Sequence, residues 1–416
     1  MSENKDWFSK AKIGLFTHYI YGTYPPGSNK NYGGTCKSAR DLTQADSLDE
    51  LAEAFDARRF AKAADSMAAQ YVTFTVSHHA GHNLLFPSRT MRDAGLPQKT
   101  SRRDLIRDIL DELNVYGIKL ALYYAPNIIR DLTAEEKKVL GWENDDIRRD
   151  FNCRLIREIY ERYGKDIVGF WFDGDSGQKL CDTVREVNPD AVIFRNYGIT
   201  ENGAYFNAGR EDFWVSEYFG PLPSTPSDTW PTHFSQVSRI FGGSWWAKGR
   251  PVTKVTARDL YRWTVRVAAT EGQRNGGVHW AAGPYMDNEW EDGVERLMSE
   301  LGAMIKRRKE SLFDTLPSAA YPTPGKSVLP PGHWGVATQS LNGSKTYLHV
   351  LNAPKSDTLK LGKPSTQGCE WNFTRAEIAG KAAGLVKVEN GWEITLPAGT
   401  DWDKDDTVVT LWTKLW

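Results

Sequence analysis

Short, mostly apolar runs alternate with amphipathic helical patterns along the first three quarters of the chain, and this alternation limits the possible folds more than any other feature. The clearest runs are KIGLFTH at 12–18, YVTFTVSHH at 71–79, KLALYYAP at 119–126, IVGFWFDG at 167–174, AVIFRN at 191–196, DFWVSEY at 212–218 and GVHWAAGP at 277–284. Runs that are apolar on both faces are typical of parallel strands covered on both sides. About eight strand–helix units predict an α/β fold, a (β/α)8-like TIM barrel. The alternative is a doubly wound open sheet, but no G-x-G-x-x-G motif follows the first run.

Amphipathic patterns between these runs predict the helices. Leu105, Ile109 and Leu113 recur every four residues between Ser101, a candidate N-cap, and Gly117, a candidate helix end. The predicted helices cover 47–69, 101–117, 145–164, 178–188, 233–241, 258–272 and 289–308.

The character of the sequence changes after residue 315. The stretch PTPGKSVLPPGHWG is rich in Pro and Gly, and short β-branched runs with turn signals follow it, including the hairpin dipeptide Asn390-Gly391. We therefore predict a barrel domain over residues 1–315 and a small C-terminal antiparallel β-sandwich over residues 316–416.

Charge and hydropathy exclude several kinds of partner. Lys and Arg number 52 and Asp and Glu 53, so the net charge of −1 offers no basic field for nucleic acid. The N-terminal MSENKDWFSK has no apolar leader, and no apolar run reaches the roughly 18 residues of a membrane span. We expect no membrane partner and a cytoplasmic protein, or a secreted or periplasmic one if a signal peptide has been removed. The sequence makes no prediction of the oligomeric state.

Aromatic and cysteine content narrows the choice further. Aromatic residues make up 12% of the chain, including 16 Trp, and aromatic faces suit the apolar faces of sugar rings as well as protein cores. The four cysteines lack C-x-x-C spacing, which argues against a zinc knuckle or a disulfide framework. We expect a neutral small-molecule or oligosaccharide partner.

Polar residues follow nearly every predicted strand at its C-terminal end, where the reactive groups of a barrel gather. They are His18, His78 and His79, Tyr123 and Tyr124, Asp173 and Asp175, Arg195 and Asn196, Glu217 and Tyr218, and His279 and Trp280. Each of these residues taken singly also has a structural explanation; an Asp before Gly, for example, often forms a turn. Their common position predicts one functional rim.

Two carboxylates with several histidines suggest glycoside hydrolysis, which needs one ionised carboxylate and one protonated carboxyl beside the scissile bond. Neutral His and Tyr side chains provide hydrogen bonds to sugar hydroxyls. A metal-dependent barrel hydrolase is a weaker alternative because strand 1 lacks an H-x-H pair. A carbohydrate-binding protein on an inactive hydrolase scaffold is another alternative.

Several stretches resemble the α-L-fucosidases of glycoside hydrolase family 29. KIGLFTHYIYG is similar to that family's K-F-G-I-F-I-H-W-G opening, and YVTFTVSHHAGH is similar to its Y-V-V-L-T-x-K-H-H-D-G-F stretch. DIVGFWFDGD resembles the family's nucleophile strand, FRNYG its N-x-R-W-G stretch, and DFWVSEY its acid/base stretch. The similarity extends over nearly the whole chain, including the C-terminal β-sandwich.

The resemblance implies a retaining hydrolase of terminal α-L-fucosyl residues, without metal or other cofactor, acting on an oligosaccharide or glycoconjugate. Asp173 matches the nucleophile and Glu217 the acid/base. Matches to substrate-binding residues of the family, together with one residue from the last barrel strand, give the expected sugar pocket: His18, His78, His79, Tyr124, Trp171, Arg195 and Trp280. Asp175 and Glu271 are alternative carboxylates, of which Asp175 is expected to play a supporting role and Glu271 to lie at the wrong rim.

Departures from the family pattern lie beside the reacting carboxylates. Ala80 and His82 replace an Asp and a Phe after the histidine pair, and Tyr19 replaces a Trp after His18. His279 stands where the family has an apolar and amide-rich stretch. We expect the chemistry to be retained and the sugar preference to be shifted, toward a substituted fucoside or a related L-sugar such as an α-L-galactoside.

Overall fold

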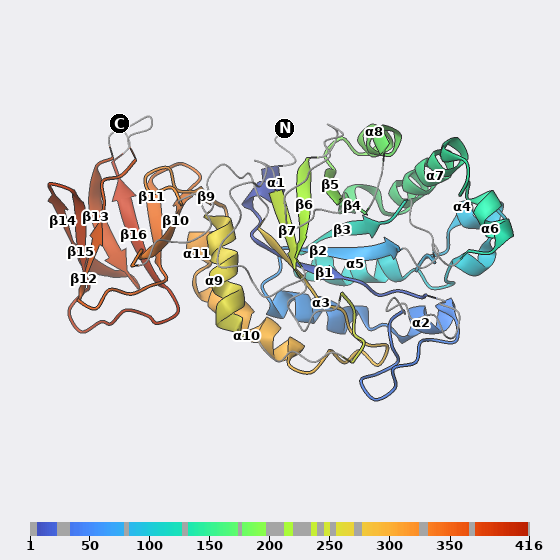
Figure 1. The fold of residues 1–416 in the computed structure, drawn as a ribbon, viewed down its shortest axis with the longest axis horizontal. Coiled ribbons are helices and arrows are strands. Elements are labelled where there is room, and N and C mark those ends of the chain that lie inside the picture. The colour runs from blue at the N-terminus through green and yellow to red at the C-terminus, as the bar shows by residue number, and fades with distance from the viewer. Residues whose placement is uncertain are drawn as a thin grey trace.

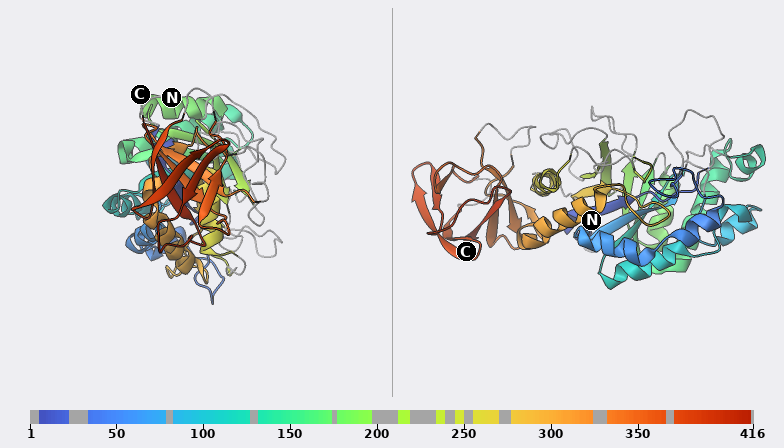
Figure 2. Two further views of the ribbon diagram at one scale, coloured as in Figure 1. Left: turned by 90° about the vertical axis from the view of Figure 1, so that its left-hand side faces the viewer. Right: turned by 90° about the horizontal axis from the view of Figure 1, so that it is seen from below.

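Two β-sheets organise the chain in the computed structural model (Figure 1). The structure describes residues 6–22, 34–78, 83–126, 132–173, 177–196, 212–218, 234–238, 245–249, 255–269, 277–323, 332–365 and 371–414. Helices surround the first sheet, and the second sheet forms one end of the elongated molecule (Figure 2).

The first sheet is a closed parallel barrel in which the strands follow chain order and β8 pairs with β1. Its strands are β1 (Ile13–Thr17), β2 (Tyr71–Ser77), β3 (Lys119–Tyr124), β4 (Ile167–Asp173), β5 (Val192–Asn196), β6 (Phe213–Tyr218), β7 (Phe234–Ser238) and β8 (Val278–Ala281). The helices are α1 (Asp6–Lys10), α2 (Leu48–Ala54), α3 (Ala57–Ser66), α4 (Arg89–Asp93), α5 (Leu105–Val115), α6 (Ala134–Val139), α7 (Asp145–Tyr163), α8 (Gly177–Val187), α9 (Ala257–Ala268), α10 (Val294–Arg307) and α11 (Lys309–Leu312). The predicted TIM barrel is confirmed.

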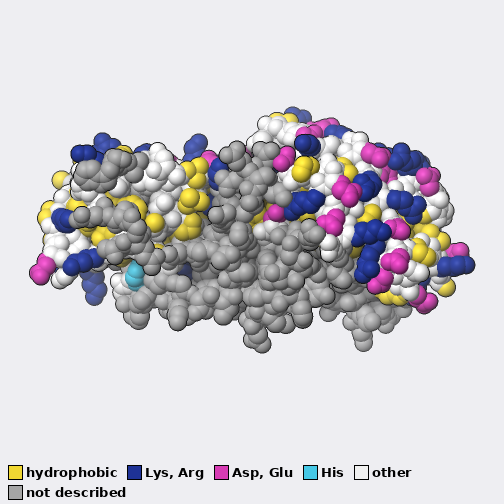
Figure 3. Space-filling model, turned by 90° about the horizontal axis from the view of Figure 1, so that it is seen from above, with side chains coloured by type: hydrophobic (Ala, Val, Ile, Leu, Met, Phe, Trp, Pro, Cys, Tyr) yellow, Lys and Arg dark blue, Asp and Glu magenta, His cyan; other side chains and the backbone are white. Residues whose placement is uncertain are grey.

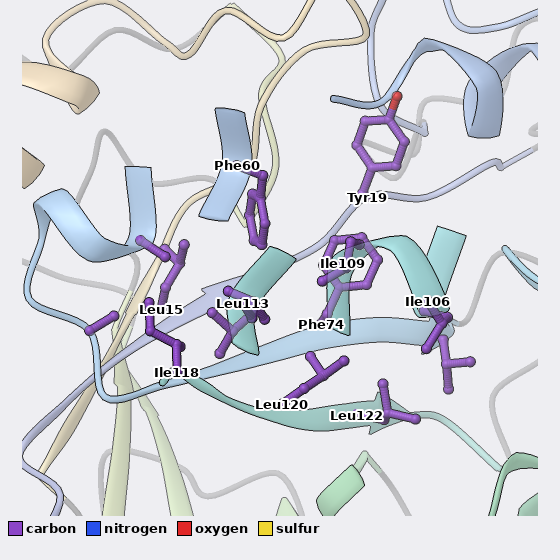
Figure 4. Close-up of a cluster of buried hydrophobic side chains, with 14 of the residues drawn as sticks. Leu15, Tyr19, Phe60, Phe74, Ile106, Ile109, Leu113, Ile118, Leu120 and Leu122 are labelled. Carbon is purple, nitrogen blue, oxygen red and sulfur yellow. The ribbon is translucent and has the colours of Figure 1, made fainter. Parts of the chain in front are cut away.

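Along the barrel strands whose side chains the structure describes, these side chains alternate between two separate cores, because successive strand residues point to opposite faces. Leu120, Leu122 and Phe74 belong to the core between the barrel and its helices, where they pack near Ile109 and Leu113 of α5 (Figure 4). Phe16, Tyr123, Trp171 and Phe194 belong to the core inside the barrel, which Phe8 of α1 also enters. Both faces of these strands are therefore apolar, which is why their sequences lack a clear alternation.

Three predicted helices need correction. The stretch 233–241 contains strand β7, which pairs with β6 and β8. Its sequence FSQVS has three polar residues in five, so it lacks the apolar run that marks the other strands.

The pattern at 47–69 forms two helices, because the Asp56 side chain caps a new helix, α3, by accepting from the backbone N–H of Arg59. Helix α5 is capped by Asp104, which accepts from the N–H of Arg107, and not by Ser101.

The second sheet is antiparallel and has eight strands in the order β12-β15-β14-β13-β16-β11-β10-β9. They are β9 (Thr315–Pro317), β10 (Gly335–Ser340), β11 (Lys345–Val350), β12 (Thr358–Leu361), β13 (Phe373–Ile378), β14 (Lys381–Val388), β15 (Gly391–Thr395) and β16 (Thr407–Thr413). The first three residues of β14 pair with β13 and the rest pair with β15, so this strand passes from one layer to the other. Leu348, Ile394 and Leu411 lie in the core enclosed by the layers, as expected for the predicted sandwich. The division at 315/316 stays a prediction; β9 begins at Thr315.

Asp406 joins the sandwich to the barrel helices through a fully buried set of polar contacts. Its Oδ2 accepts from Tyr261 Oη of α9 at 2.5 Å and lies 2.7 Å from His349 Nδ1 of β11. Its backbone carbonyl accepts from Arg308 Nε at 3.0 Å. The other His349 nitrogen lies 3.3 Å from the carbonyl oxygen of Ser311. Contacts of this kind hold the two sheets in a fixed relation, because each buried donor depends on an acceptor across the interface.

Replacement of Asp406 by Ala is expected to lower the free energy of unfolding by about 3–5 kcal/mol, because Tyr261 and His349 lose a buried charged acceptor. Thermal and chemical denaturation of the purified variant provide the measurement. Asp401→Ala, at an exposed position of the same domain, is the matched control and should change stability little. Equal stability of the two variants would contradict the role assigned to Asp406.

Acid is expected to weaken the same interface. Burial by itself raises the pKa of Asp406, but the attraction and hydrogen bond of His349, together with Tyr261 and Arg308, outweigh it and hold that pKa below its usual value. A lowered pKa adds stability that is complete above the ordinary carboxyl pKa of about 4 and is lost as the pH falls below it. Unfolding free energies measured between about pH 6 and pH 3 should therefore fall more steeply for the wild type than for Asp406→Asn.

Candidate active site

Asp173 ends strand β4 at the C-terminal rim of the barrel, and two neighbouring strands hold its carboxyl group. Tyr123 Oη at the end of β3 donates to Oδ2 at 2.5 Å, and Asn196 Nδ2 at the end of β5 donates to Oδ1 at 3.0 Å. The β4–β5 ladder pairs Asp173 directly with Asn196. Because each oxygen is bound from a different side, the plane of the carboxyl group is fixed while the side chain stays partly exposed.

The Tyr123 ring lies in a stack that fixes its hydroxyl. Its centroid is 5.1 Å from that of Trp171, with 23° between the planes, and 5.6 Å from that of His78, with 26° between the planes. Trp171 is fully buried two residues before Asp173, so it forms the floor below the carboxyl group. A phenol held between two rings has little freedom to leave the carboxylate.

His78, which belongs to this stack, also contacts a second histidine. The rings of His18, after β1, and His78, after β2, lie 4.7 Å apart, and His18 is also 4.5 Å from Tyr123. His18 Nδ1 is hydrogen-bonded to the Thr75 hydroxyl, which fixes the ring orientation. Both histidines are more than nine-tenths buried. The predicted residues Asp173, Trp171, His18 and His78 are therefore brought together.

Residues 245–249, which the sequence does not predict as part of the site, lie next to the two histidines. The backbone N–H of His18 donates to the carbonyl of Trp245 at 3.3 Å, and the Trp246 ring lies 6.0 Å from both histidine rings. Lys248 Nζ lies 4.4 Å above the Trp246 ring. Within the described residues, the Trp246 indole N–H has no hydrogen-bond partner. The stretch 245–249 thus packs two aromatic rings against the two histidines.

Two predicted pocket residues point away from the site. Tyr124 lies in the core outside the barrel, where its hydroxyl donates to Asn152 of α7. Trp280 lies in the same outer core, and its Nε1 donates to Thr264 Oγ1 of α9 at 3.2 Å. Alternation along the strand explains both corrections, because the neighbouring residues Tyr123 and His279 are the ones that face inward.

His279 lies inside the barrel among aromatic rings and below the rim. Its ring is 4.8 Å from Tyr71 and 5.6 Å from Phe194, and it is fully buried. Burial lowers its pKa to about 3, so the ring is neutral near pH 7. His279 therefore fills the barrel interior and carries no charge toward the site.

Other predicted residues are described only in part. Arg195 and Glu217 lie on β5 and β6, with Glu217 paired to Val237 of β7, but their side chains lie outside the described part of the chain. His79, Asp175 and Glu271 also lie outside the described residues.

Within the described residues, no three His, Cys, Asp or Glu side chains are grouped so as to hold a metal ion. No helix in that part of the chain has the length and hydropathy to cross a bilayer. On the face of the molecule drawn in Figure 3, Lys and Arg side chains are mixed with Asp and Glu over the described surface of the barrel.

The α-L-fucosidase family model matches residues 1–217, which is more than half of the chain and includes both nominated carboxylates. The chain belongs to the α-L-fucosidase family. The resemblance seen in the sequence is thereby confirmed, and the chain is a glycosidase of this family. A search of curated proteins gives no match.

Solved fucosidase structures share the fold. An α-L-fucosidase from Bacteroides thetaiotaomicron has 19% identity and a TM-score of 0.70, with 100% of this chain and 95% of that chain covered. Isoenzyme 1 from Paenibacillus thiaminolyticus has 18% identity and a TM-score of 0.69, with 99% of each chain covered. An α-fucosidase from Thermotoga maritima has 16% identity and a TM-score of 0.65, with 98% of this chain and 96% of that chain covered.

Removal of the Tyr123 hydroxyl is expected to impair hydrolysis of an aryl α-L-fucoside by this fucosidase. A hydrogen bond to a charged group contributes about 1.5–3 kcal/mol, so Tyr123→Phe should lower kcat/KM about 10- to 100-fold while the ring stack stays in place. Steady-state kinetics provide the measurement.

Tyr124→Phe is the matched control for that experiment. It loses the bond to Asn152 on the outer face, so it should reduce the unfolding free energy by about 1–2 kcal/mol and leave kcat/KM nearly unchanged. Equal kinetic losses in the two variants would show that the hydroxyl of Tyr123 has no special role.

Proposed function

We propose that the protein is a retaining exo-α-L-fucosidase in which Asp173 is the nucleophile and Glu217 the acid/base. The observation that carries this proposal is the carboxyl group of Asp173, held by Tyr123 and Asn196 on the rim where β4 ends. A nucleophile must meet the anomeric carbon in one orientation, and two donors from flanking strands provide that constraint.

The reaction proceeds by two displacements. Asp173 attacks the anomeric carbon as a general acid protonates the departing glycosidic oxygen, and a glycosyl–enzyme ester forms. A water molecule, deprotonated by the same residue acting as a base, then releases the sugar with its original anomeric configuration. Glu217 is the penultimate residue of β6, two strands along the barrel from Asp173, which supports its choice as the acid/base. A solved Bacteroides thetaiotaomicron α-L-fucosidase of 19% identity is described as a trapped covalent intermediate with 2-fluoro-fucosyl fluoride.

Two histidines line the proposed sugar pocket. His18 and His78 lie beside the Tyr123 ring, and His18 is oriented by Thr75. Imidazole nitrogens can donate to or accept from hydroxyl groups, whereas the partly exposed Trp245 ring offers apolar surface for a C–H face or a methyl group. This mixture supports a 6-deoxy sugar such as L-fucose as the terminal residue, with an α-L-galactoside or a substituted fucoside as the nearest competitor.

Asp173→Ala is expected to lower kcat for an aryl α-L-fucoside at least 10³-fold, since it removes the group that forms the covalent bond. Azide in the assay should restore part of the activity and give a fucosyl azide of inverted configuration, which NMR identifies. Full activity of Asp173→Ala would overturn the assignment, and inactivity of the wild type on every α-L-glycoside would favour a binding protein on this scaffold.

Glu217→Gln should show a dependence on the leaving group. Substrates with acidic phenols need little protonation, so their glycosylation step should be nearly normal, whereas a fucosyl disaccharide should be hydrolysed about 10²- to 10⁴-fold more slowly. Activity against a series of phenols provides the test. Uniform losses across the series would direct the search to another carboxylate.

A further inference from the structure

A small cavity of about 300 Å³ opens on the C-terminal sandwich, away from the barrel rim. Three segments line it: 320–323 after β9, 333–336 at the start of β10, and 362–365 after β12. Cavities that bind small molecules begin at roughly this volume, so it has room for one or two sugar rings. It contains none of the residues assigned to hydrolysis.

Aromatic rings form one side of the cavity. His333 and Trp334 are stacked, with centroids 5.3 Å apart and planes at 23°, and the Tyr321 ring meets Trp334 edge-on at 6.2 Å. These three side chains are only partly buried, although Tyr321 and Trp334 also pack against the sandwich core. Figure 3 shows hydrophobic side chains and a histidine together on the surface of this domain.

Hydrogen-bonding groups of defined direction line the rest of the cavity. The Gly335 backbone N–H donates to His333 Nδ1 at 3.3 Å, so in the neutral ring the proton is on Nε2, which is a donor. Burial lowers the pKa of His333, which favours that neutral form. Lys363 is exposed at the edge of the cavity and adds a cationic donor. Within the described residues, the Trp334 indole N–H has no hydrogen-bond partner.

We propose that this cavity is a second carbohydrate site, which binds one pyranose unit of a glycan outside the catalytic centre. A pyranose has an apolar C–H face that suits the Trp334 ring and a rim of hydroxyls that accept from His333 Nε2 and Lys363. The single cation and the neutral imidazole match an uncharged sugar better than a phosphate or sulfate, which would need several paired charges. The proposal does not depend on the roles of Asp173 and Glu217.

Fluorine NMR of the full chain labelled with 5-fluorotryptophan tests the site directly. The Trp334 signal is assigned by its absence from the Trp334→Phe spectrum, or from that of Trp334→Tyr if the first variant does not fold. Trp412, which lies on β16 of the same domain and outside the cavity, is assigned in the same way and serves as the internal control. The probes are L-fucose, D-galactose and N-acetyl-D-glucosamine at millimolar concentrations, and sodium sulfate at matched ionic strength.

At least one sugar is expected to shift the Trp334 signal saturably and leave the Trp412 signal in place. Lys363→Ala, a surface substitution, should weaken that binding about tenfold, which equals about 1.4 kcal/mol. The same variant should hydrolyse an aryl α-L-fucoside with unchanged kcat and KM. The proposal is overturned if no sugar shifts the Trp334 signal, if sulfate alone shifts it, or if Lys363→Ala leaves the titration unchanged.

Discussion

The alternation of side chains along the barrel strands β1 to β4 and β8, whose side chains the structure describes, is the constraint on which the rest of the structure depends. Along these strands, every second side chain enters the barrel and its neighbour enters the layer under the helices. Because of this alternation, the Tyr123 hydroxyl donates to Asp173, whereas the Tyr124 hydroxyl donates to Asn152 of helix α7. It also decides that His279 fills the barrel while Trp280 bonds to Thr264. One residue along a strand thus separates a group beside Asp173 from a group that binds a helix.

The sequence predicts the architecture well because parallel strands that are covered on both sides leave long apolar runs. The same property makes it impossible to tell from the sequence which face of the sheet a given residue lies on, since a strand that is apolar on both faces shows no alternation of polar and apolar residues. Tyr123 and Tyr124 are therefore equivalent in sequence, and the structure alone separates them. The sequence predicts a helix in place of strand β7 for the opposite reason. The stretch FSQVS is largely polar, and pairing with the neighbouring strands sets its place in the barrel.

Asn196 shows a second limit of prediction. An asparagine at a strand end is common and does not by itself indicate a functional role. The sequence favours the adjacent Arg195 as the site residue, because of its charge and its match to the family. The ladder between β4 and β5 sets Asn196 opposite Asp173, so its role depends on pairing between segments separated by a helix. Asp406 is a similar case: nothing in its local sequence indicates that Tyr261, from 145 residues earlier in the chain, donates to it.

The stack of His78, Tyr123 and Trp171 ties together two properties that enzymes often vary separately. Under the proposed function, His78 lies in the pocket that takes the sugar, and Tyr123 carries the hydroxyl that donates to Asp173. A change that widens the wall at His78 also removes one of the two planes that confine the tyrosine ring. Under the proposed function, a larger space for sugar on this side is therefore linked to a less firmly held Tyr123 hydroxyl, and so to a less firmly oriented carboxyl group at Asp173.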